Sequence, residues 1–97
     1  MIKSFKNKAT ENIFNGKANK AAIKTCPKTL WKKVFRKLDQ LDSVLSLDEL
    51  RVPPGNKLKS LSGNRKGQYS IRINDQYRIC FKWVENEPVD VEVTDYH

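Results

Sequence analysis

The C-terminal half of the chain brings together side chains that are suited to the cleavage of RNA. Without a metal, RNA is cut when a neighbouring 2′-OH attacks the phosphate, which requires a base, an acid and cations that offset the developing charge. Arg72 and Arg78 suit the last task, because a guanidinium matches the geometry of phosphate oxygens and keeps its charge. Asp95, Tyr96 and His97 offer groups for proton transfer, and Tyr96 could also stack on an exposed base. Taken singly, these residues also fit a basic domain that only binds nucleic acid.

Two predicted strands, 69–73 and 77–83, hold the two arginines. In both strands, large apolar residues alternate with small or charged ones, which is typical of half-buried strands. An odd loop centred on Asp75 puts the apolar side chains on one face and pairs Arg72 with Arg78 on the other. Because like charges directly opposite each other destabilise a sheet, we interpret this pair as an anion site.

A last strand, 89–93, follows a second turn at 85–88 and is expected to pair with the strand before it. Matching their apolar faces pairs Trp83 with Val89, Phe81 with Val91 and Ile79 with Val93. The same register predicts a polar face that gathers Arg72, Arg78, Lys82, Glu92 and Tyr96. The alternative to an anion site is that Arg72 only pairs with Glu92.

The clearest helix is predicted to begin at Pro27, with Thr25 as its cap, and to end between Leu41 and Val44. Its apolar stripe comprises Leu30, Val34, Leu38, Leu41 and Leu45, widened by Trp31 and Phe35. Its other side carries the basic residues Lys32, Lys33, Arg36 and Lys37. That basic side is either an ordinary solvated surface or a surface for a polyanion.

The other N-terminal segments are shorter. Residues 2–5 are expected to form a short strand or edge piece, 7–15 a short helix, and 17–24 a loop or loose helix. A capping box, Ser46 with Glu49, predicts one further helical turn. Packing these helices on the apolar face of the antiparallel sheet gives an α+β fold, and 97 residues correspond to a single domain, 1–97.

Charge and cysteine content bound the function further. The net charge is +8, and residues 1–40 hold eleven Lys and Arg against two acids, whereas 41–97 hold eight against nine. This asymmetry indicates contact with a polyanion or, alternatively, a solvated basic surface. Two cysteines without a secretory signal or an apolar span indicate a reduced, cytosolic protein outside the membrane. The single histidine, His97, excludes a histidine-rich metal site.

Several motifs together resemble one family. They are the segment Pro53-Pro54-Gly55-Asn56 with Leu58, the run Leu61-Ser62-Gly63-Asn64-Arg65-Lys66-Gly67-Gln68-Tyr69-Ser70-Ile71-Arg72-Ile73-Asn74-Asp75-Gln76-Tyr77-Arg78-Ile79-Cys80-Phe81, the opening Met1-Ile2-Lys3-Ser4-Phe5 and the closing Asp95-Tyr96-His97. The chain thereby resembles the HigB-type toxins of the RelE/ParE superfamily, in a subgroup with the Pro-Pro-Gly-Asn segment.

The resemblance implies a bacterial, cytoplasmic toxin of a type II toxin–antitoxin pair. Its activity would be that of a ribosome-dependent endoribonuclease, an mRNA interferase that cuts mRNA in the A site and inhibits translation without metal or organic cofactor. The expected partners are a HigA-type helix-turn-helix antitoxin, the ribosome and its mRNA, with operator DNA contacted only through the antitoxin.

The resemblance also implies roles for individual residues. Arg78 matches the family's strand arginine, and the terminal Asp95, Tyr96 and His97 match its catalytic end. Lys59 stands where many relatives carry a catalytic histidine, and Ser62 where they carry a helpful lysine. A lysine is charged at neutral pH, so we expect Lys59 to act as a phosphate clamp or acid and His97 to take the proton. Residues expected to bind RNA phosphates are Arg65, Lys66, Arg72, Lys82, Lys32, Lys33, Arg36 and Lys37.

Two alternatives remain. One is a non-cleaving toxin of the ParE branch, which shares the fold but poisons gyrase; the Asp-Tyr-His end argues against it. The other is a degenerate toxin that only binds RNA or its antitoxin, in which Lys59 and Ser62 are lost catalytic positions. The latter predicts salt-sensitive RNA binding without cleavage.

Overall fold

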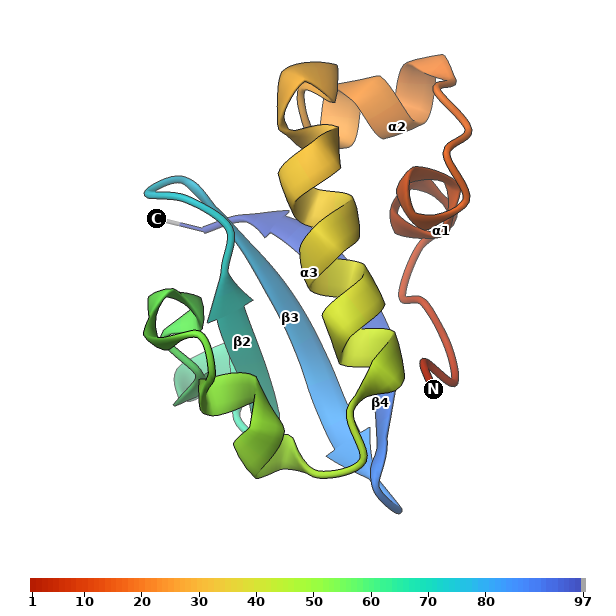
Figure 1. The fold of residues 1–97 in the computed structure, drawn as a ribbon. Coiled ribbons are helices and arrows are strands. Elements are labelled where there is room, and N and C mark those ends of the chain that lie inside the picture. Colours follow the sequence, from red (N-terminus) through yellow and green to blue (C-terminus); the bar gives the residue numbers. More distant parts are fainter. Residues whose placement is uncertain (97) are drawn as a thin grey trace.

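The computed structural model describes residues 1–96, in which three α-helices lie on one face of a four-stranded antiparallel sheet with strand order β1-β2-β3-β4 (Figure 1). The helices are α1 (Lys8–Phe14), α2 (Lys20–Thr25) and α3 (Trp31–Ser43). The strands are β1 (Lys59–Ser60), β2 (Gln68–Arg72), β3 (Tyr77–Val84) and β4 (Glu87–Asp95). The 3-10 turns are η1 (Lys28–Leu30), η2 (Leu47–Arg51), η3 (Pro54–Asn56) and η4 (Gly63–Arg65). The predicted α+β fold is therefore confirmed.

Asparagine side chains start the two short helices. Asn7 accepts a hydrogen bond from the backbone N–H of Thr10 at 2.9 Å, and Asn19 accepts one from Ala22 at 2.9 Å. Each bond satisfies an N–H that has no partner inside the helix. Of the two alternatives for 17–24, the helix is the one that forms.

The long helix begins later than the sequence pattern predicted. Thr25 is the last residue of α2 rather than a cap, so that prediction is wrong. Pro27 has an extended ψ of 136°, and the turn η1 separates it from the first residue of α3, Trp31. The indole N–H of Trp31 donates to the carbonyl of Cys26 at 2.9 Å, which holds the junction between α2 and α3. The predicted end of the helix, between Leu41 and Val44, is confirmed.

Helix α3 supplies one half of the core, and strands β2 to β4 supply the other. Val34, Leu38 and Leu41 are fully buried, as are Ile79 and Phe81 from the sheet. Burial of each such side chain stabilises the fold by ~1.5–3 kcal/mol.

Two residues assigned to the apolar stripe of α3 do not join this core. Leu45 lies beyond the end of the helix at Ser43 and is 80% exposed. Phe35 is 46% exposed, and its ring stacks on Phe14 of α1 with 5.7 Å between centroids. The stripe is therefore narrower than predicted and is one turn shorter.

The hairpin between β2 and β3 has the predicted register. Arg72 pairs with Arg78, Ile71 with Ile79 and Tyr69 with Phe81. The side chain of Asn74 closes the turn by accepting hydrogen bonds from the backbone N–H groups of Gln76 and Tyr77, at 2.9 and 2.7 Å.

The pairing between β3 and β4 is only partly as predicted. Ile79 faces Val93, but Trp83 faces Pro88 instead of Val89, because the register shifts between Cys80 and Lys82. The extra residue is in β4, where Asp90 has a left-handed φ of +53°. Such a bulge places two residues opposite one and bends the strand. The predicted pair Trp83–Val89 is therefore wrong, whereas Phe81 lies opposite the bulge, which includes its predicted partner Val91.

The N-terminal segment explains why β4 bulges there. Residues 3–6 run alongside β4, with a single parallel bridge between Phe5 and Val91, so the segment is an edge piece rather than a full strand. The hydroxyl of Ser4 accepts the backbone N–H of Asp90 at 2.9 Å, which satisfies the group that the bulge withdraws from the ladder.

The connection from α3 to β1 is held by side-chain contacts with the backbone. Both bonds of the predicted capping box, between Ser46 and Glu49, are present at the start of η2. The side chain of Asn56 is fully buried at the end of η3, and Lys57 follows it in the left-handed conformation, with φ of +44°. Within the described residues, no helix is long and apolar enough to cross a membrane.

Candidate active site

Cross-strand pairing gathers the predicted site residues on the sheet face that lies away from the helices. Paired residues of antiparallel strands point to the same side. One row consists of Arg72, Arg78 and Thr94. The next row consists of Lys59, Ser70, Cys80 and Glu92. Lys59 and the arginine pair therefore share one face, as the sequence predicted for the arginines.

Two hydrogen bonds fix the guanidinium of Arg78. Its Nε donates to the hydroxyl of Ser70 at 2.7 Å, and its Nη2 donates to the backbone carbonyl of Lys57 at 2.8 Å. An arginine has five N–H donors, so others are left for a ligand. Burial lowers the pKa of Arg78, and the charge of Arg72 lowers it further. Arginine stays protonated at neutral pH nonetheless, so both cations of the pair are charged.

Arg72 has a different partner from the one considered from sequence. Its guanidinium pairs with Asp75 in the hairpin turn, whereas Glu92 pairs with Arg65 and Lys6. The side chain of Asp75 is 99% exposed, and ion pairs of this kind contribute little free energy in water. Arg72 therefore remains able to exchange this carboxylate for a phosphate.

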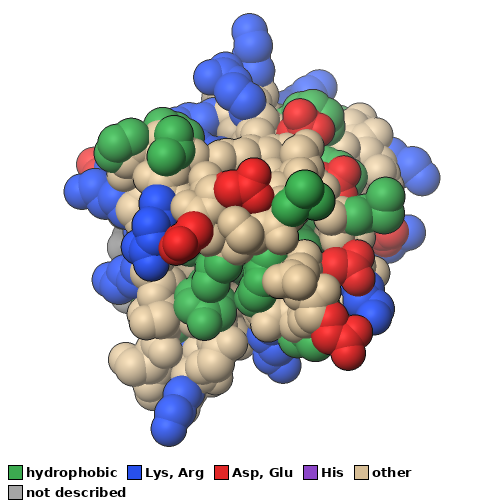
Figure 2. Space-filling model, turned by 60° about the horizontal axis from the view of Figure 1, so that its bottom comes forward, with side chains coloured by type: hydrophobic (Ala, Val, Ile, Leu, Met, Phe, Trp, Pro, Cys, Tyr) green, Lys and Arg blue, Asp and Glu red, His purple; other side chains and the backbone are tan. Residues whose placement is uncertain are grey.

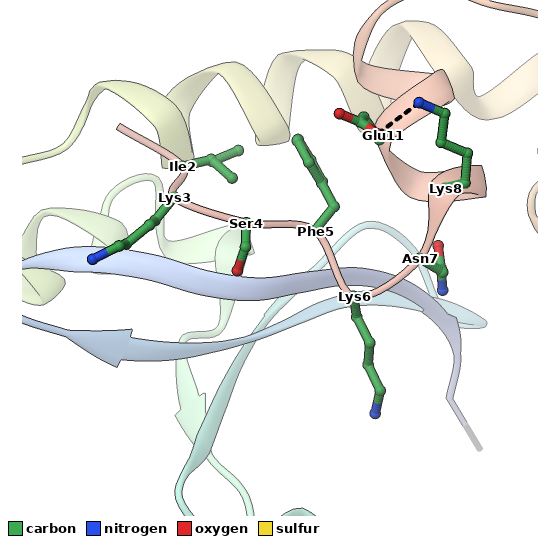
Figure 3. Close-up of a pocket in the computed structure, with 8 residues that line it drawn as sticks. All are labelled: Ile2, Lys3, Ser4, Phe5, Lys6, Asn7, Lys8 and Glu11. Carbon is green, nitrogen blue, oxygen red and sulfur yellow. Dashed lines mark hydrogen bonds and ion pairs between the residues drawn. The ribbon is translucent and has the colours of Figure 1, made fainter.

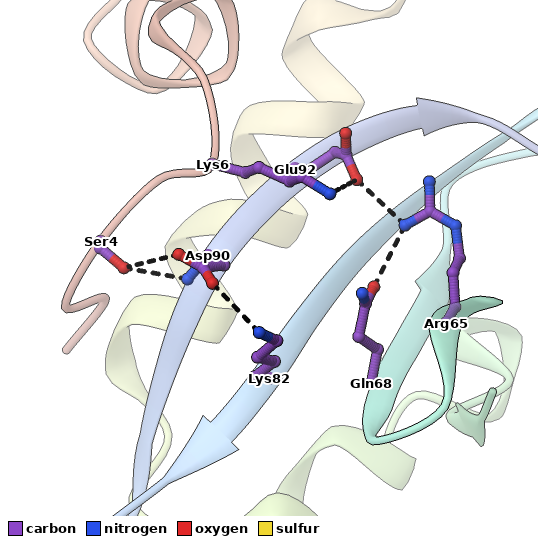
Figure 4. A network of polar contacts seen from close by, with 7 residues as sticks. All are labelled: Ser4, Lys6, Arg65, Gln68, Lys82, Asp90 and Glu92. Atoms are coloured by element: carbon purple, nitrogen blue, oxygen red, sulfur yellow. Dashed lines mark hydrogen bonds and ion pairs between the residues drawn. The ribbon is translucent and has the colours of Figure 1, made fainter. Parts of the chain in front are cut away.

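A network of polar contacts lies across strands β3 and β4 (Figure 4). Glu92 accepts a hydrogen bond from Arg65 at 3.0 Å and lies 3.9 Å from the Nζ of Lys6. Burial lowers the pKa of Arg65, but the hydrogen bond to Glu92 together with the charges of Cys80, Glu92 and Tyr96 outweighs this effect, so the pKa of Arg65 is raised. In the same face, Lys82 lies 3.5 Å from the carboxylate of Asp90. Acidic partners thus partly neutralise Arg65 and Lys82, two of the predicted phosphate-binding residues.

Small side chains form the floor between these cations. Ser70 and Cys80 are fully buried although they point to the polar face. Burial raises the pKa of the Cys80 thiol, while Thr94, Arg65 and Arg78 act in the opposite direction. Thr94 Oγ1 is buried and lacks a hydrogen bond of normal geometry within residues 1–96, so its contact with the thiol is weak.

Asp95 and Tyr96, near the C-terminal end of β4, point to opposite faces of the sheet. Tyr96 is close enough to Arg65 and Arg78 to favour their charged forms, which places it at the arginine face. Asp95 pairs with Tyr77 in the register, and residues of one strand alternate between faces, so Asp95 points to the other side. His97 lies outside the described residues.

The residue Gln76 connects the C-terminal end of β4 to the β2–β3 turn. Its side-chain amide donates to Asp95 at 3.1 Å, and its backbone carbonyl accepts the N–H of Tyr96 at 2.8 Å. The orientation of the chain end is therefore coupled to the turn that also holds Arg72.

The basic side of α3 does not join the arginine face. Helix α3 covers the opposite face of the sheet, so Lys32, Lys33 and Arg36 lie in a separate layer (Figure 1). Lys37 donates to the buried amide of Asn56, and burial followed by the charges of Lys33 and Arg36 lowers the pKa of Lys37. Lys66, in contrast, is exposed in the loop that precedes β2, near the predicted site.

The surface at the end of the β3–β4 hairpin differs from the arginine face. In this view, acidic and hydrophobic side chains gather toward the centre, and lysines and arginines lie mostly at the rim (Figure 2). Exposed apolar residues of the chain include Leu45, Val52 and Val84. The charge of +8 is therefore not spread evenly, and this end offers a polyanion no continuous basic surface.

A groove of about 460 Å³ lies along the N-terminal segment (Figure 3), and Arg78 does not line it. It is lined by residues 2–8 and Glu11, and Lys8 pairs with Glu11 at 3.0 Å. Lys6 connects this groove to the arginine face through its ion pair with Glu92. Among residues 1–96, no group of three or more His, Cys, Asp or Glu side chains is placed to hold a metal.

Sequence reasoning missed two groups that hold Arg78. The first is Ser70, because a serine between large apolar residues in a strand carries a weak signal. The second group is the carbonyl of Lys57, which no side-chain pattern can reveal. The turn-forming Pro-Pro-Gly-Asn segment that precedes it is the one available indication of a special backbone conformation there.

Comparison with known proteins identifies the family of this chain. Residues 3–97 match the family described as RelE-like toxin of type II toxin-antitoxin system HigB. The chain is 40% identical over 85 residues to Toxin HigB-1 of Vibrio cholerae, covering 88% of this chain and 86% of the relative. It is 29% identical over 97 residues to Endoribonuclease HigB of Proteus vulgaris, covering 100% of both chains.

The fold also has a counterpart among solved structures. A chain of the YoeB-YefM complex from Staphylococcus aureus matches with a TM-score of 0.61 at 18% identity, covering 100% of this chain and 98% of that chain. At this identity the likeness concerns the fold alone. The sequence match over residues 3–97 carries the assignment: the chain belongs to the HigB-like family of RelE-like toxins of type II toxin–antitoxin systems.

Proposed function

We propose that this toxin is an endoribonuclease that cuts mRNA on the ribosome. The observation that carries the proposal is the fixed guanidinium of Arg78, which is held by Ser70 and the Lys57 carbonyl and keeps further donors for a phosphate. Preorganised donors of this kind stabilise charge that develops in a transition state. The similarity to a protein named Endoribonuclease HigB supports the same class of activity.

In the proposed reaction, Arg78 and Arg72 bind the non-bridging oxygens of the scissile phosphate. The 2′-oxygen of the preceding ribose bonds to phosphorus, and the bond from phosphorus to the 5′-oxygen breaks, which leaves a 2′,3′-cyclic phosphate and a 5′-OH. His97 takes the proton of the 2′-OH and Lys59 gives a proton to the leaving oxygen. Lys59 is exposed and shares the sheet face of Arg78, which is compatible with this role.

The chain end would orient the substrate. Tyr96, on the arginine face, is the proposed stacking platform for a base next to the cut. Asp95 would act indirectly, because it faces the other side of β4 and is tied to Gln76. This assigns Asp95 to the support of Tyr96 and His97 rather than to contact with the phosphate.

The remaining cations would hold the RNA and the ribosome. Lys66, Arg65 and Lys82 would contact phosphates of the mRNA from the edge of the arginine face. Lys32, Lys33 and Arg36 form a separate exposed row on α3, which would suit ribosomal RNA on the other side of the toxin. Lys37 would contribute less, because its ammonium is bound to Asn56.

We further propose a HigA-type helix-turn-helix antitoxin as partner, which would inhibit the toxin. The toxin would contact operator DNA only indirectly, through this antitoxin. Membership in a type II toxin–antitoxin family supports an antitoxin of some class. A ribosomal target would place the toxin, as a single domain, in the bacterial cytoplasm.

The test is to induce the toxin in cells and map RNA ends by primer extension on one reporter mRNA. A matched reporter with its start codon destroyed is transcribed but not translated. The proposal predicts new 5′ ends in the coding region of the first reporter alone. Equal cutting of both reporters would contradict ribosome dependence, and growth arrest without any cuts would favour a non-cleaving toxin.

A further inference from the structure

Asn56 is a fully buried polar side chain with an unusual number of partners. Its amide nitrogen donates to the carbonyls of Leu50 and Val52, at 3.1 and 3.3 Å, and to the side chain of Gln40 at 3.0 Å. Its amide oxygen accepts the ammonium of Lys37. This one residue therefore connects α3, the end of η2 and the turn η3.

The backbone after Asn56 takes a conformation that few side chains favour. Lys57 has a φ of +44°, in the left-handed region, and its N–H donates to the carbonyl of Pro54 at 3.1 Å. A lysine gains nothing intrinsically from this conformation, so tertiary contacts have to impose it. The bonds that anchor Asn56 are next to Lys57 and are of the kind that can do so.

The left-handed residue then directs its carbonyl at the candidate site. The oxygen of Lys57 accepts Nη2 of Arg78 at 2.8 Å, while Ser70 holds the Nε of the same guanidinium. With one bond, a guanidinium can pivot about its bonded nitrogen; with two, its plane is fixed. The second bond therefore determines where the remaining donors of Arg78 point.

We propose that Asn56 is a positioning residue for Arg78, which acts through the carbonyl of Lys57. The buried amide fixes the turn, the turn presents the carbonyl, and the carbonyl orients the guanidinium toward the scissile phosphate. This inference rests on the proposed function for its consequence in catalysis, whereas its structural part concerns the free toxin.

The structural part is tested by NMR on the free, folded toxin. The Nε–Hε signal of Arg78, assigned by its loss in Arg78→Lys, reports on the environment of the guanidinium. In Asn56→Ala the signal is expected to shift and broaden. In a control, Ile13→Ala, a buried residue of α1 is truncated, and the signal is expected to keep its position.

The catalytic part is tested by kinetics on programmed ribosomes. Asn56→Ala is expected to lower kcat about tenfold with KM within about twofold, because a misplaced group costs rate rather than binding. Asn56→Asp keeps the size and an acceptor for Lys37 but cannot donate to the carbonyls of Leu50 and Val52, so it is expected to behave like Asn56→Ala. Should both fail to fold, Gln40→Ala, at a partly exposed position, removes one of the contacts of Asn56 and the bond from Gln40 to the Val52 carbonyl, and it is expected to give the same signature, reduced in size.

The outcomes separate the two claims. An unmoved Arg78 signal together with an unchanged kcat in the Asn56 variants overturns the inference. The inference is also overturned if Ile13→Ala has the same midpoint of unfolding as the Asn56 variants and shows the same loss of kcat. Reduced stability would then explain the effect. If Arg78→Ala cleaves like the wild type, the proposed function fails instead, whatever the NMR signal does.

Discussion

The hydroxyl of Ser70 lies 2.7 Å from the Nε of Arg78 and is fully buried beneath it. Ser70 pairs with Cys80, two residues further along β3 than Arg78, so the arginine side chain leans forward along its own strand, toward Cys80, to reach the hydroxyl. A serine at this buried position is explained by its contact with Arg78, because an alanine would fill the space equally well.

We therefore expect Ser70→Ala to reduce cleavage about fivefold to tenfold, because Arg78 loses one of its two anchors, while unfolding free energy changes by ~1 kcal/mol or less. Rates of mRNA cleavage and chemical denaturation measure the two effects. Ser43→Ala, which truncates an exposed serine of α3, is the matched control and should cleave normally. Wild-type cleavage by Ser70→Ala would mean that Arg78 needs no orientation.

The carboxylate of Glu92 lies between Arg65 and Lys6 and offsets their charge. We expect Glu92→Gln to bind single-stranded RNA more tightly at low salt, with a plot of log K against log salt that is steeper by about 0.7, the equivalent of one more phosphate contact. Fluorescence anisotropy over a salt series measures both quantities. Glu85→Gln makes the same change of charge at the exposed hairpin turn. An equal gain in affinity for Glu85→Gln would contradict a local role for Glu92.

Gln76 ties the chain end to the hairpin through Asp95 and Tyr96. Gln76→Ala removes the bond to Asp95 but keeps the backbone bond to Tyr96, so we expect a loss of cleavage of about threefold and little change in stability. The comparison is with Asp95→Ala in the same assay. If Asp95→Ala abolishes cleavage while Gln76→Ala has no effect, Asp95 acts by itself and not as a support.

The alternation of apolar and polar residues along a strand predicts those parts of the fold in which neighbouring strands follow each other directly in the sequence. The register of the β2–β3 hairpin follows from the placement of its apolar residues around Asp75, and it brings Arg72 beside Arg78 as predicted. The bulge at Asp90 could not be predicted in this way, because its partner, Ser4, is 86 residues away in the sequence. Alternation in β4 alone cannot reveal that contact.

The sequence likewise predicts only part of the candidate site, namely the face of the sheet on which its residues lie. Arg78 and Tyr96 were placed on one face by counting along strands, and the structure agrees for both. The same counting puts Asp95 on the opposite face of the sheet. The motif Asp-Tyr-His gives no sign of this, because it names the three residues together as one catalytic end. The groups that orient Arg78 depend on the tertiary fold, since a backbone carbonyl such as that of Lys57 is present at every position of any sequence.

The burial of the Cys26 thiol leads us to predict that the stability of the fold depends on pH. Burial raises the pKa of its thiol from 9.0 to about 11, so the unfolded chain loses this proton at lower pH than the folded protein. The contribution of Cys26 is therefore fully present below pH 9 and is lost as pH rises from 9 toward 11. Relative to Cys26→Ala, the wild type should lose about 2 kcal/mol of unfolding free energy across this range. Parallel pH profiles for the two proteins, from denaturant unfolding, would contradict the burial of the thiol.

The central claim is that Arg78 is held ready for a phosphate during cleavage of mRNA on the ribosome. Purified wild-type toxin and Arg78→Ala are compared on one mRNA, free and bound to programmed ribosomes, with EDTA present and with antitoxin binding as a check of folding. The account predicts cuts by the wild type on the ribosome alone, and a loss of about 100-fold or more for Arg78→Ala. Equal cleavage by a folded Arg78→Ala, or no cleavage by a wild type that still arrests growth, would contradict it.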